Sequence, residues 1–330
     1  MVLMDTYLPY TEDDSGEGTR EWQDLADAMG PVILNALESP AESNVTDIRR
    51  RASDGAIMIK RGGKWRKEGM LNDRKAMNVL AFAAGYAGRK IRPDMPRVSA
   101  VMPGTRGRLK GAIAPVAFGP TFAIRRPSGK VWPLEGYVDA GIMTAGQYDS
   151  LMTRVGSGYN VQCAGKPGAG KTSLLNSVFA TSYFDGKHVY AIEDDPELVL
   201  PEDHTRMLAD DTLPKPVTMQ MLASDALRWA PDVVTIGEVR GPEGLQVVEL
   251  ANGGMQLLGT VHASSARDVI PRYKRLVEQN KGVNVTTDEI VKAVQMAVYL
   301  ENENGRPIVR EIVGFEWDEG RAEVIATTLA

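Results

Sequence analysis

The sequence predicts an α/β protein in which a smaller α+β domain precedes a larger domain built on a mostly parallel sheet. Two observations support this prediction. From residue 146 onward, short apolar segments alternate with helical ones, as in parallel sheets whose strands are joined through helices. Before residue 126 the order is helix, hairpin, helix and three short strands. The 330 residues are enough for two separate cores.

The first domain is expected over residues 19–125, after a flexible acidic start at 1–18. Gly62 and Gly63 mark the turn of its hairpin, and Gly30 with Pro31 marks a break in its first helix. Its elements are a helix over 21–37, a hairpin from residue 55, a helix over 72–88, and strands over 98–102, 108–115 and 121–125. Residues 126–145 contain two prolines and three glycines, which predicts a linker.

The second domain is expected over residues 146–330. The tail from 297 to 327 reads as a meander with turns at Asn304 and Gly320, which would extend the sheet. Ligands of parallel sheets bind at the carboxyl ends of the strands, so the residues that follow each strand are the candidates for function. The strands are predicted over 159–164, 188–192, 232–236 and 256–261, and the helices over 173–180, 218–229 and 242–253.

The segment after the first of these strands reads GKPGAGKT and fits the pattern G-x-x-x-x-G-K-[ST] of a phosphate-binding loop. Its glycines let backbone N–H groups turn toward phosphates, and the helix that follows directs its positive end at them. Lys171 would reach the β and γ phosphates of ATP and Thr172 would bind Mg²⁺, so the chain is predicted to be an ATPase. The predicted nucleotide-binding residues of this segment are Gly165, Lys166, Pro167, Gly168, Ala169, Gly170, Lys171, Thr172 and Ser173.

Three later strands also end in polar side chains. The acidic run at 193–197 can hold Mg²⁺ or orient the attacking water, and a solvated acidic turn is the alternative. Glu238 and Arg240 end the next strand, and His262 ends the last. A single histidine is often structural, but its place at the same edge as the loop favours a γ-phosphate sensor or a polar link between Glu238 and the nucleotide.

The composition, 43% apolar and 25% charged, is that of a soluble globular protein, and no run approaches the ~18 apolar residues that cross a bilayer. The acidic start lacks the basic and apolar regions of a signal peptide, so we expect a cytoplasmic protein. Cys163 is the only cysteine, which fits a reducing compartment and predicts a small core residue in the strand before the loop.

Charge is segregated along the chain. Residues 1–40 carry one Arg and nine acids (net −8), residues 41–130 carry twenty Lys and Arg and six acids (net +14), and residues 131–330 carry seventeen and twenty-eight (net −11). The basic block predicts an anionic partner: a membrane surface, nucleic acid, nucleotide phosphates or an acidic neighbouring subunit. A solvated basic surface is the alternative, since few aromatic side chains lie between the cations to stack on bases.

Four motifs in this order resemble those of the hexameric ATPases of type II and type IV secretion systems, and among them the TrbB-like conjugal transfer ATPases. They are the loop GKPGAGKT, the acidic segment IEDDPEL, the strand APDVVTIGEVRG and the histidine segment GTVHASSARD. PRVSAVMPG, FAIRRP and LEGYVDAGIMTAGQ extend the resemblance to about residues 20–327. It implies a RecA-like P-loop NTPase domain that binds ATP and Mg²⁺ in a homo-hexamer. Such a ring would lie in the cytoplasm, peripheral to the inner membrane, and dock on inner-membrane secretion components.

The resemblance also implies roles for single residues. Glu238 would polarise the attacking water. Arg125 and Arg126, at the end of the first domain, would reach nucleotide phosphates within the chain or in a neighbouring subunit. The residues implied in catalysis are Glu238, Glu193, Glu197, His262 and Arg240, and those implied in metal binding are Thr172, Glu193 and Asp194.

Two segments depart from the family pattern. Lys166 and Pro167 stand where many relatives have Gly or a Thr-Gly pair, and Pro167 removes one N–H donor from the loop. Residues 254–256 read GMQ in place of the usual Thr-Gly-His. The sequence leaves two consequences of the proline open, namely slower catalysis and a more rigid loop.

The leading hypothesis is a motor of a conjugative type IV secretion system, in which the first domain closes over nucleotide about the linker. Two alternatives stay open. A pilus-assembly or Tad-type secretion ATPase shares the motifs and differs in its partners. A protein that binds nucleic acid through residues 41–130, with nucleotide as a switch, would show DNA binding with a steep salt dependence.

Overall fold

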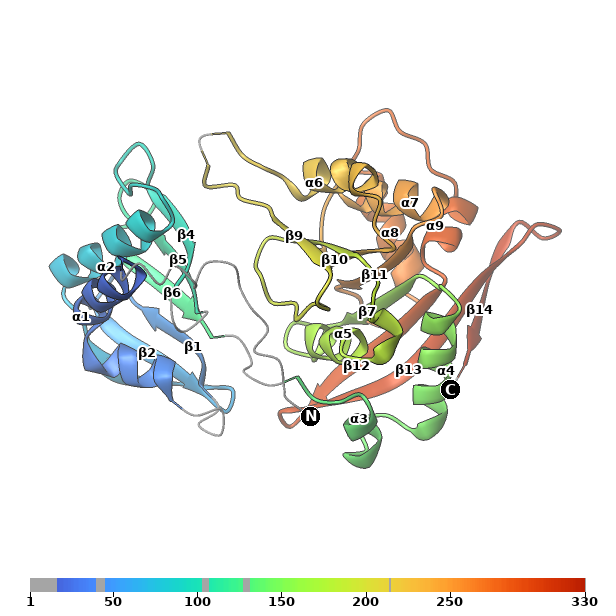
Figure 1. Ribbon diagram of the computed structural model, residues 1–330, viewed down its shortest axis with the longest axis horizontal. Helices are drawn as coiled ribbons and strands as arrows, with labels where there is room; N and C mark the ends of the chain where they lie inside the picture. The colour runs from blue at the N-terminus through green and yellow to red at the C-terminus, as the bar shows by residue number, and fades with distance from the viewer. Residues whose placement is uncertain (1–16, 40–44, 103–106, 127–130, 214, 330) are drawn as a thin grey trace. The chain divides into compact units, whose positions relative to one another are not determined.

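The computed structural model describes residues 17–39, 45–102, 107–126, 131–213 and 215–329. The chain divides into two compact units, one made of residues 1–130 and 212–214 and the other of residues 131–211 and 215–330 (Figure 1). The predicted flexible start at 1–18 lies outside the described residues except at its end, where helix α1 (Glu17–Glu38) begins.

The first unit is a six-stranded antiparallel sheet with two helices packed on one face (Figure 1). The strand order is β3-β2-β1-β6-β5-β4. Leu25 and Ile33 of α1 and Leu80 of α2 share one buried cluster with Ile48 and Ile59 of the sheet. The elements are β1 (Val45–Arg50), β2 (Ala56–Arg61), β3 (Lys64–Met70), α2 (Asp73–Tyr86), β4 (Arg97–Val101), β5 (Arg108–Ala112) and β6 (Thr121–Arg125).

Two local predictions for this unit are confirmed by its backbone. Helix α1 is kinked at Gly30, where φ is 73° and Pro31 follows. The β2–β3 hairpin turns at Gly62 and Gly63, with φ of 53° and 80°. Both angles lie in the left-handed region that glycine adopts without steric cost, which is why this pair marks the turn.

A buried arginine ties together three segments at one end of this sheet. Arg50 is the last residue of β1 and is only 2% exposed. Its Nε donates to the carbonyl of Leu71 at 2.9 Å, and its other N–H groups bond to the carbonyl of Pro120 and the carboxylate of Asp73. β1 was not predicted, because its sequence VTDIRR has three charges in six residues and ends in this arginine.

The second unit contains an eight-stranded sheet in the order β14-β13-β12-β7-β11-β10-β8-β9. The six strands from β12 to β9 run parallel, and β13 and β14 add antiparallel strands at one edge. The predicted α/β class with a mostly parallel sheet is therefore confirmed. The strands are β7 (Val161–Gly165), β8 (Val189–Glu193), β9 (His204–Leu208), β10 (Val233–Val239), β11 (Gln256–Val261), β12 (Met296–Glu303), β13 (Arg306–Asp318) and β14 (Glu323–Thr328).

Both faces of the parallel strands are buried under separate groups of helices. Along β8, Val189 and Ala191 belong to the cluster that includes α4 and α5, whereas Tyr190 and Ile192 belong to the cluster that includes α6 to α9. Cys163 is 1% exposed on the α5 side, so the prediction of a small core residue is confirmed. The helices are α3 (Glu135–Asp139), α4 (Ala145–Gly156), α5 (Lys171–Phe179), α6 (Met219–Asp225), α7 (Gly244–Asn252), α8 (Val269–Val277) and α9 (Thr287–Ala293), with 3₁₀ turns η2 (Ser182–Phe184) and η3 (Ala226–Trp229).

Several elements of this unit were not predicted, namely α4, α8, α9 and β9. β9 lies at the sheet edge with four of its five side chains half-buried, so it lacks the alternation that marks a strand. Residues 126–145, predicted as a linker, include α3. The predicted tail meander is confirmed, since β12 to β14 extend the sheet. Among the described residues, no helix combines the length and apolar composition needed to cross a bilayer.

Candidate functional site

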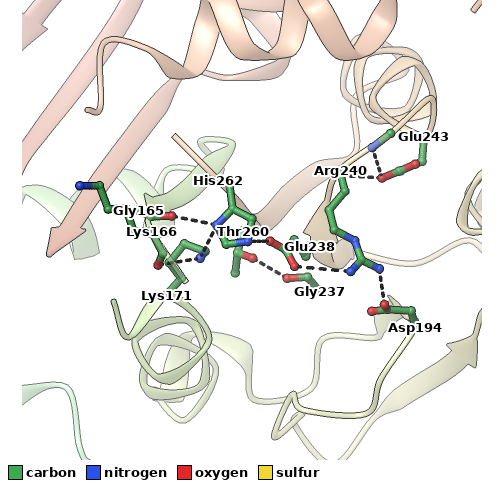
Figure 2. Close-up of polar contacts among 11 residues, drawn as sticks. Gly165, Lys166, Lys171, Asp194, Gly237, Glu238, Arg240, Glu243, Thr260 and His262 are labelled. Atoms are coloured by element: carbon green, nitrogen blue, oxygen red, sulfur yellow. Dashed lines mark hydrogen bonds and ion pairs between the residues drawn. The ribbon is translucent and has the colours of Figure 1, made fainter. Parts of the chain in front are cut away.

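The ends of three neighbouring parallel strands meet at one edge of the second sheet. Ala164 of β7 pairs with Val261 of β11, and Val261 pairs with Val239 of β10. The loop after β7, His262 after β11 and Glu238 near the end of β10 therefore lie close together (Figure 2). The structure thus brings together three of the four groups of polar residues that the sequence singled out at strand ends, and the fourth, the acidic run after β8, joins them through Asp194, which pairs with Arg240.

The backbone of the loop after β7 requires glycine at two positions because of what packs against it. At Gly165, φ is 153°, and a Cβ would lie 2.4 Å from the carbonyl oxygen of Leu300 in β12. At Gly170, φ is 95°, and a Cβ would lie 2.9 Å from the Cβ of Pro307 in β13. Packing against β12 and β13 therefore fixes the curvature of the loop.

Lys171, the first residue of α5, is buried beside this loop, with 7% of its surface exposed. Its Nζ lies 3.3 Å from the carbonyl oxygen of Lys166 and 3.1 Å from Nδ1 of His262. The N–H groups in the first turn of α5 have no acceptor within the helix, and the helix dipole adds positive charge there. A buried ammonium beside such N–H groups suits a phosphate chain, so the loop fits a nucleotide.

His262 connects the loop to the carboxylate of Glu238 (Figure 2). Its Nε2 contacts Oε1 of Glu238, and its Nδ1 faces the Lys171 ammonium. An ammonium only donates hydrogen bonds, so the contact with Lys171 requires Nδ1 as the acceptor, which leaves the proton on Nε2, facing Glu238. In this tautomer the 3.0 Å approach of Nδ1 to the carbonyl of Gly165 is a contact and not a hydrogen bond. A neutral histidine thereby links the cation of the loop to a carboxylate.

Arg240 faces the other side of the Glu238 carboxylate. Its Nη1 lies 3.9 Å from Oε2 of Glu238, and its Nη2 pairs with the carboxylate of Asp194. The backbone N–H of Arg240 donates to Oε1 of Glu243 at 2.6 Å, which holds the turn after β10. Cationic and anionic side chains therefore alternate along this edge (Figure 2). Neutral His262 lies between Lys171 and Glu238. Arg240 follows Glu238, and Asp194 follows Arg240.

Glu193, at the end of β8, is 1% exposed; one of its oxygens accepts hydrogen bonds and the other forms an ion pair. Its Oε1 accepts the backbone N–H groups of Glu197 and Leu198, both at 2.8 Å, and its Oε2 lies 3.1 Å from Nε of Arg206 in β9. Burial raises the pKa of the Glu193 carboxyl to about 7, against the opposing effect of Arg206 and the two N–H groups. The side chain therefore shapes the acidic turn at 193–197.

The residues predicted as metal ligands do not form a preassembled metal centre. Both oxygens of Glu193 are engaged as described, and Asp194 is paired with Arg240. In the described parts of the chain, no group of three or more His, Cys, Asp or Glu side chains is placed to hold a metal ion. Mg²⁺ that arrives with nucleotide phosphates needs only one or two protein ligands, and the half-buried Thr172 at the start of α5 fits that requirement.

The two arginines predicted to reach phosphates belong to the first unit. Arg125 ends β6, where it pairs in register with Asp47 and Arg108, and its side chain is exposed. Arg126 donates to Oγ of Ser39 at 3.0 Å and also to the Ser39 carbonyl. Arg125 is therefore an exposed residue at the end of β6, whereas Arg126 is bonded to Ser39, the residue after α1.

Two further arginines lie near the loop and were not predicted. An open pocket of about 330 Å³ is lined by Lys166, Pro167 and His262 and by Arg272 and Arg275 of α8. Their only signal in the sequence is the i, i+3 spacing of two cations on one helix after the histidine motif. They place additional positive charge beside the exposed part of the loop.

The loop, the strand order and the polar strand ends define an α/β protein of the P-loop type. The family model described as "Type II/IV secretion system protein" matches residues 75–312, so the chain belongs to this family. The chain is 27% identical over 306 residues to the probable conjugal transfer protein TrbB of Sinorhizobium fredii, with 91% of both chains covered. It is 26% identical over 280 residues to the type IV secretion system protein VirB11 of Bartonella quintana, covering 72% of this chain and 78% of that one.

Solved structures share the fold at lower identity. The ATPase DotB of Legionella pneumophila matches with a TM-score of 0.58 and 18% identity, covering 88% of this chain and 82% of that one. The pilus retraction motor PilT with bound ADP matches with a TM-score of 0.57 and 15% identity, covering 91% and 82%. The fold is therefore the one found in these two proteins.

We expect the buried Glu193 carboxyl to make the second unit less stable as the pH rises from about 5 to 7. Its pKa is raised from 4.5 to about 7, so the folded state binds the proton more tightly than the unfolded chain. This contribution is present below the unfolded pKa and is lost as the pH rises through the folded one. In Glu193→Gln, urea unfolding at pH 5, 6 and 7 should show a pH dependence smaller by about 1–3 kcal/mol. Exposed Glu202→Gln should keep the wild-type pH dependence. An unchanged slope in Glu193→Gln would contradict this assignment.

Proposed function

We propose that this chain hydrolyses ATP as the ring-forming motor of a conjugative type IV secretion system. The observation that carries the proposal is the line of contacts from Lys171 through His262 to Glu238 beside a glycine loop. One neutral histidine lies between a cation that can bind phosphate and a carboxylate that can orient water. The secretion setting is supported by family membership and by the conjugal transfer relatives.

Each residue of the strand-end cluster has a role in this proposal. ATP and Mg²⁺ supply the reacting γ-phosphoryl group and the divalent charge that neutralises its oxygens. Lys171 and the first N–H groups of α5 bind the phosphates, and the hydroxyl of Thr172 binds the metal ion. The Glu238 carboxylate orients the attacking water and takes up its proton. Arg240, held by Asp194, restricts the carboxylate to one position.

His262 couples occupancy of the loop to the placement of Glu238. Phosphate oxygens compete with Nδ1 of His262 for the Lys171 ammonium, because both accept from the same donor. When the ammonium turns to phosphate, the imidazole loses that donor while its Nε2 still faces Glu238. The histidine thereby acts as the sensor of bound nucleotide.

The other predicted residues complete the site less directly. Arg125 or Arg126 neutralises phosphate charge, from the first unit of the same chain or of a neighbour in a ring of six copies. Glu193 positions the acidic turn that carries Asp194 and Glu197, and in this role it acts on the metal ion and water only through that turn.

The ring would lie in the cytoplasm against inner-membrane components of the secretion apparatus. A pilus or Tad-type motor is the second candidate, and the shared fold with PilT is the observation that favours it. A nucleotide-switched protein that binds nucleic acid through residues 41–130 is the third, favoured by their net charge of +14 from twenty cations and six acids. Assembly into a ring and rapid ATP hydrolysis would distinguish the two motor functions from the nucleotide switch.

Glu238→Gln keeps the shape of the side chain and removes the base. We expect ATP to bind with a Kd within about threefold of wild type, while phosphate release falls about 10²–10⁴-fold. Filter binding of ATP and steady-state phosphate release measure the two quantities. Glu249→Gln, at an exposed position of α7, is the matched control and should retain wild-type turnover. Wild-type hydrolysis by Glu238→Gln would exclude it as the residue that activates water.

The same ATP-trapping variant tests the ring. Its mass in solution with Mg²⁺ and ATP should be close to that of six copies, because nucleotide held between units favours assembly. A monomer under these conditions would contradict the motor and favour the nucleotide switch.

Arg125→Ala and Arg126→Ala, singly and together, test the contribution of the first unit. Loss of the arginine that reaches the phosphates should lower kcat by about 10³-fold. Arg126→Ala also removes the bonds to Ser39, so its melting temperature is compared with that of Arg125→Ala to separate folding from catalysis. Lys64→Ala, an exposed cation of β3, should leave kcat unchanged. Wild-type kcat in both single variants and the double variant would rule out this role.

A further inference from the structure

The hairpin formed by β12 and β13 lies beside the glycine loop. β12 pairs in parallel with β7 up to Leu300 and Gly165, so the residues after Leu300 run next to the loop that follows β7. The chain then reverses direction at Asn304 and Gly305, where φ is 54° and 90°. Asn-Gly with two positive φ angles is typical of a tight type I′ hairpin turn. A short, well-defined turn therefore stands close to the loop, although the two are far apart in the sequence.

Asn302 connects this turn to the loop through both groups of its side-chain amide. Its Oδ1 accepts the backbone N–H of Gly305 at 2.8 Å, and its Nδ2 donates to the carbonyl of Gly168 at 3.0 Å. The partners fix which end of the amide is which, because an N–H needs an acceptor and a carbonyl needs a donor. The hairpin turn thus orients Asn302, and Asn302 in turn holds the loop.

The segment that Asn302 holds is a type II β-turn over residues 166–169. The N–H of Ala169 donates to the carbonyl of Lys166 at 3.1 Å, which closes the turn. Pro167 occupies its second position and Gly168, with φ of 76°, its third. Proline fixes its own φ near −65°, and a positive φ at the next residue then defines type II. Lys166 and Pro167, which depart from the family pattern, therefore build a preformed turn.

One peptide group of the loop is held on both sides by these bonds. It joins Gly168 to Ala169, and its carbonyl accepts from Asn302 while its N–H donates to the carbonyl of Lys166. The same Lys166 carbonyl lies 3.3 Å from Nζ of Lys171, the ammonium assigned to phosphate. A continuous set of hydrogen bonds therefore runs from the hairpin turn to the cation of the loop.

We propose that Asn302 is a positioning residue for nucleotide, which holds the turn at 166–169 in the shape that receives the phosphates. A loop that is already ordered loses little conformational entropy when a ligand binds, and this favours binding. Asn302 acts through the loop and does not touch ATP. The inference rests on the proposed function for the identity of the ligand. It predicts a change in affinity and not in the chemical step, because Glu238 and His262 belong to other strands.

Two variants of Asn302 test this role on the full chain. Asn302→Asp keeps the acceptor for Gly305 but cannot donate to Gly168, and Asn302→Leu removes both bonds without adding charge. The Kd of a non-hydrolysable ATP analogue should rise about three- to tenfold in both variants, as expected for one lost hydrogen bond. Phosphate release at saturating ATP should give a kcat within about twofold of wild type.

Asn304→Asp is the matched control, because it adds the same charge at an exposed position of the same turn. Aspartate tolerates the positive φ of this position, so the turn is kept. Its Kd should equal that of wild type. Melting temperatures measured without nucleotide separate folding from binding, since only Asn302→Leu also loses the bond to Gly305. The rise in Kd should be shared by both Asn302 variants even where the melting temperature falls in one.

A wild-type Kd in either Asn302 variant overturns the proposal. An equal rise in Asn304→Asp also overturns it, because the effect would then be one of charge. So does a fall in kcat of about tenfold or more with an unchanged Kd, which would place Asn302 in the chemical step. If the wild-type chain binds no ATP analogue, the proposed function itself fails, whereas a failure seen only in the comparison of variants leaves that function intact.

Discussion

The parallel register of β7, β11 and β10 is the constraint on which the candidate site depends. Val261 pairs with Ala164 on one side and Val239 on the other, so the glycine loop, His262 and Glu238 meet although they are far apart in the sequence. Both faces of these strands are buried, and a slip of one residue would turn buried side chains to the opposite face. The core of the second unit thereby fixes the distance between Lys171 and Glu238.

The loop keeps the groups that we propose bind phosphate, despite an unusual sequence. Pro167 has no N–H, but it is exposed and precedes the first turn of α5, whose N–H groups it leaves in place. Lys166 contributes through its backbone, since its carbonyl accepts from Nζ of Lys171 at 3.3 Å and from the N–H of Ala169 at 3.1 Å. The proline therefore restricts the loop without removing the donors that helix α5 supplies.

Local patterns in the sequence predicted most of the strands, the glycine loop and the polar strand ends, because each depends on neighbouring residues. Partners that are distant in the sequence were not predicted. The sequence places Glu193 at a strand end, but its role depends on Arg206 in β9, an edge strand without an alternating pattern. Likewise, β1 was missed because its buried final residue is Arg50, whose partners come from two other segments. Buried residues are usually apolar. A hydropathy pattern therefore misses a strand whose buried residue is a charged side chain with a partner.

The central claim is that neutral His262 couples the Lys171 ammonium to the Glu238 carboxylate during ATP hydrolysis. The most direct measurement is kcat for His262→Ala, with the Kd of a non-hydrolysable ATP analogue measured on the same sample. The coupling predicts that kcat falls about 10²-fold while Kd stays within about threefold of wild type, because Lys171 still binds phosphate. A wild-type kcat in His262→Ala would contradict the claim.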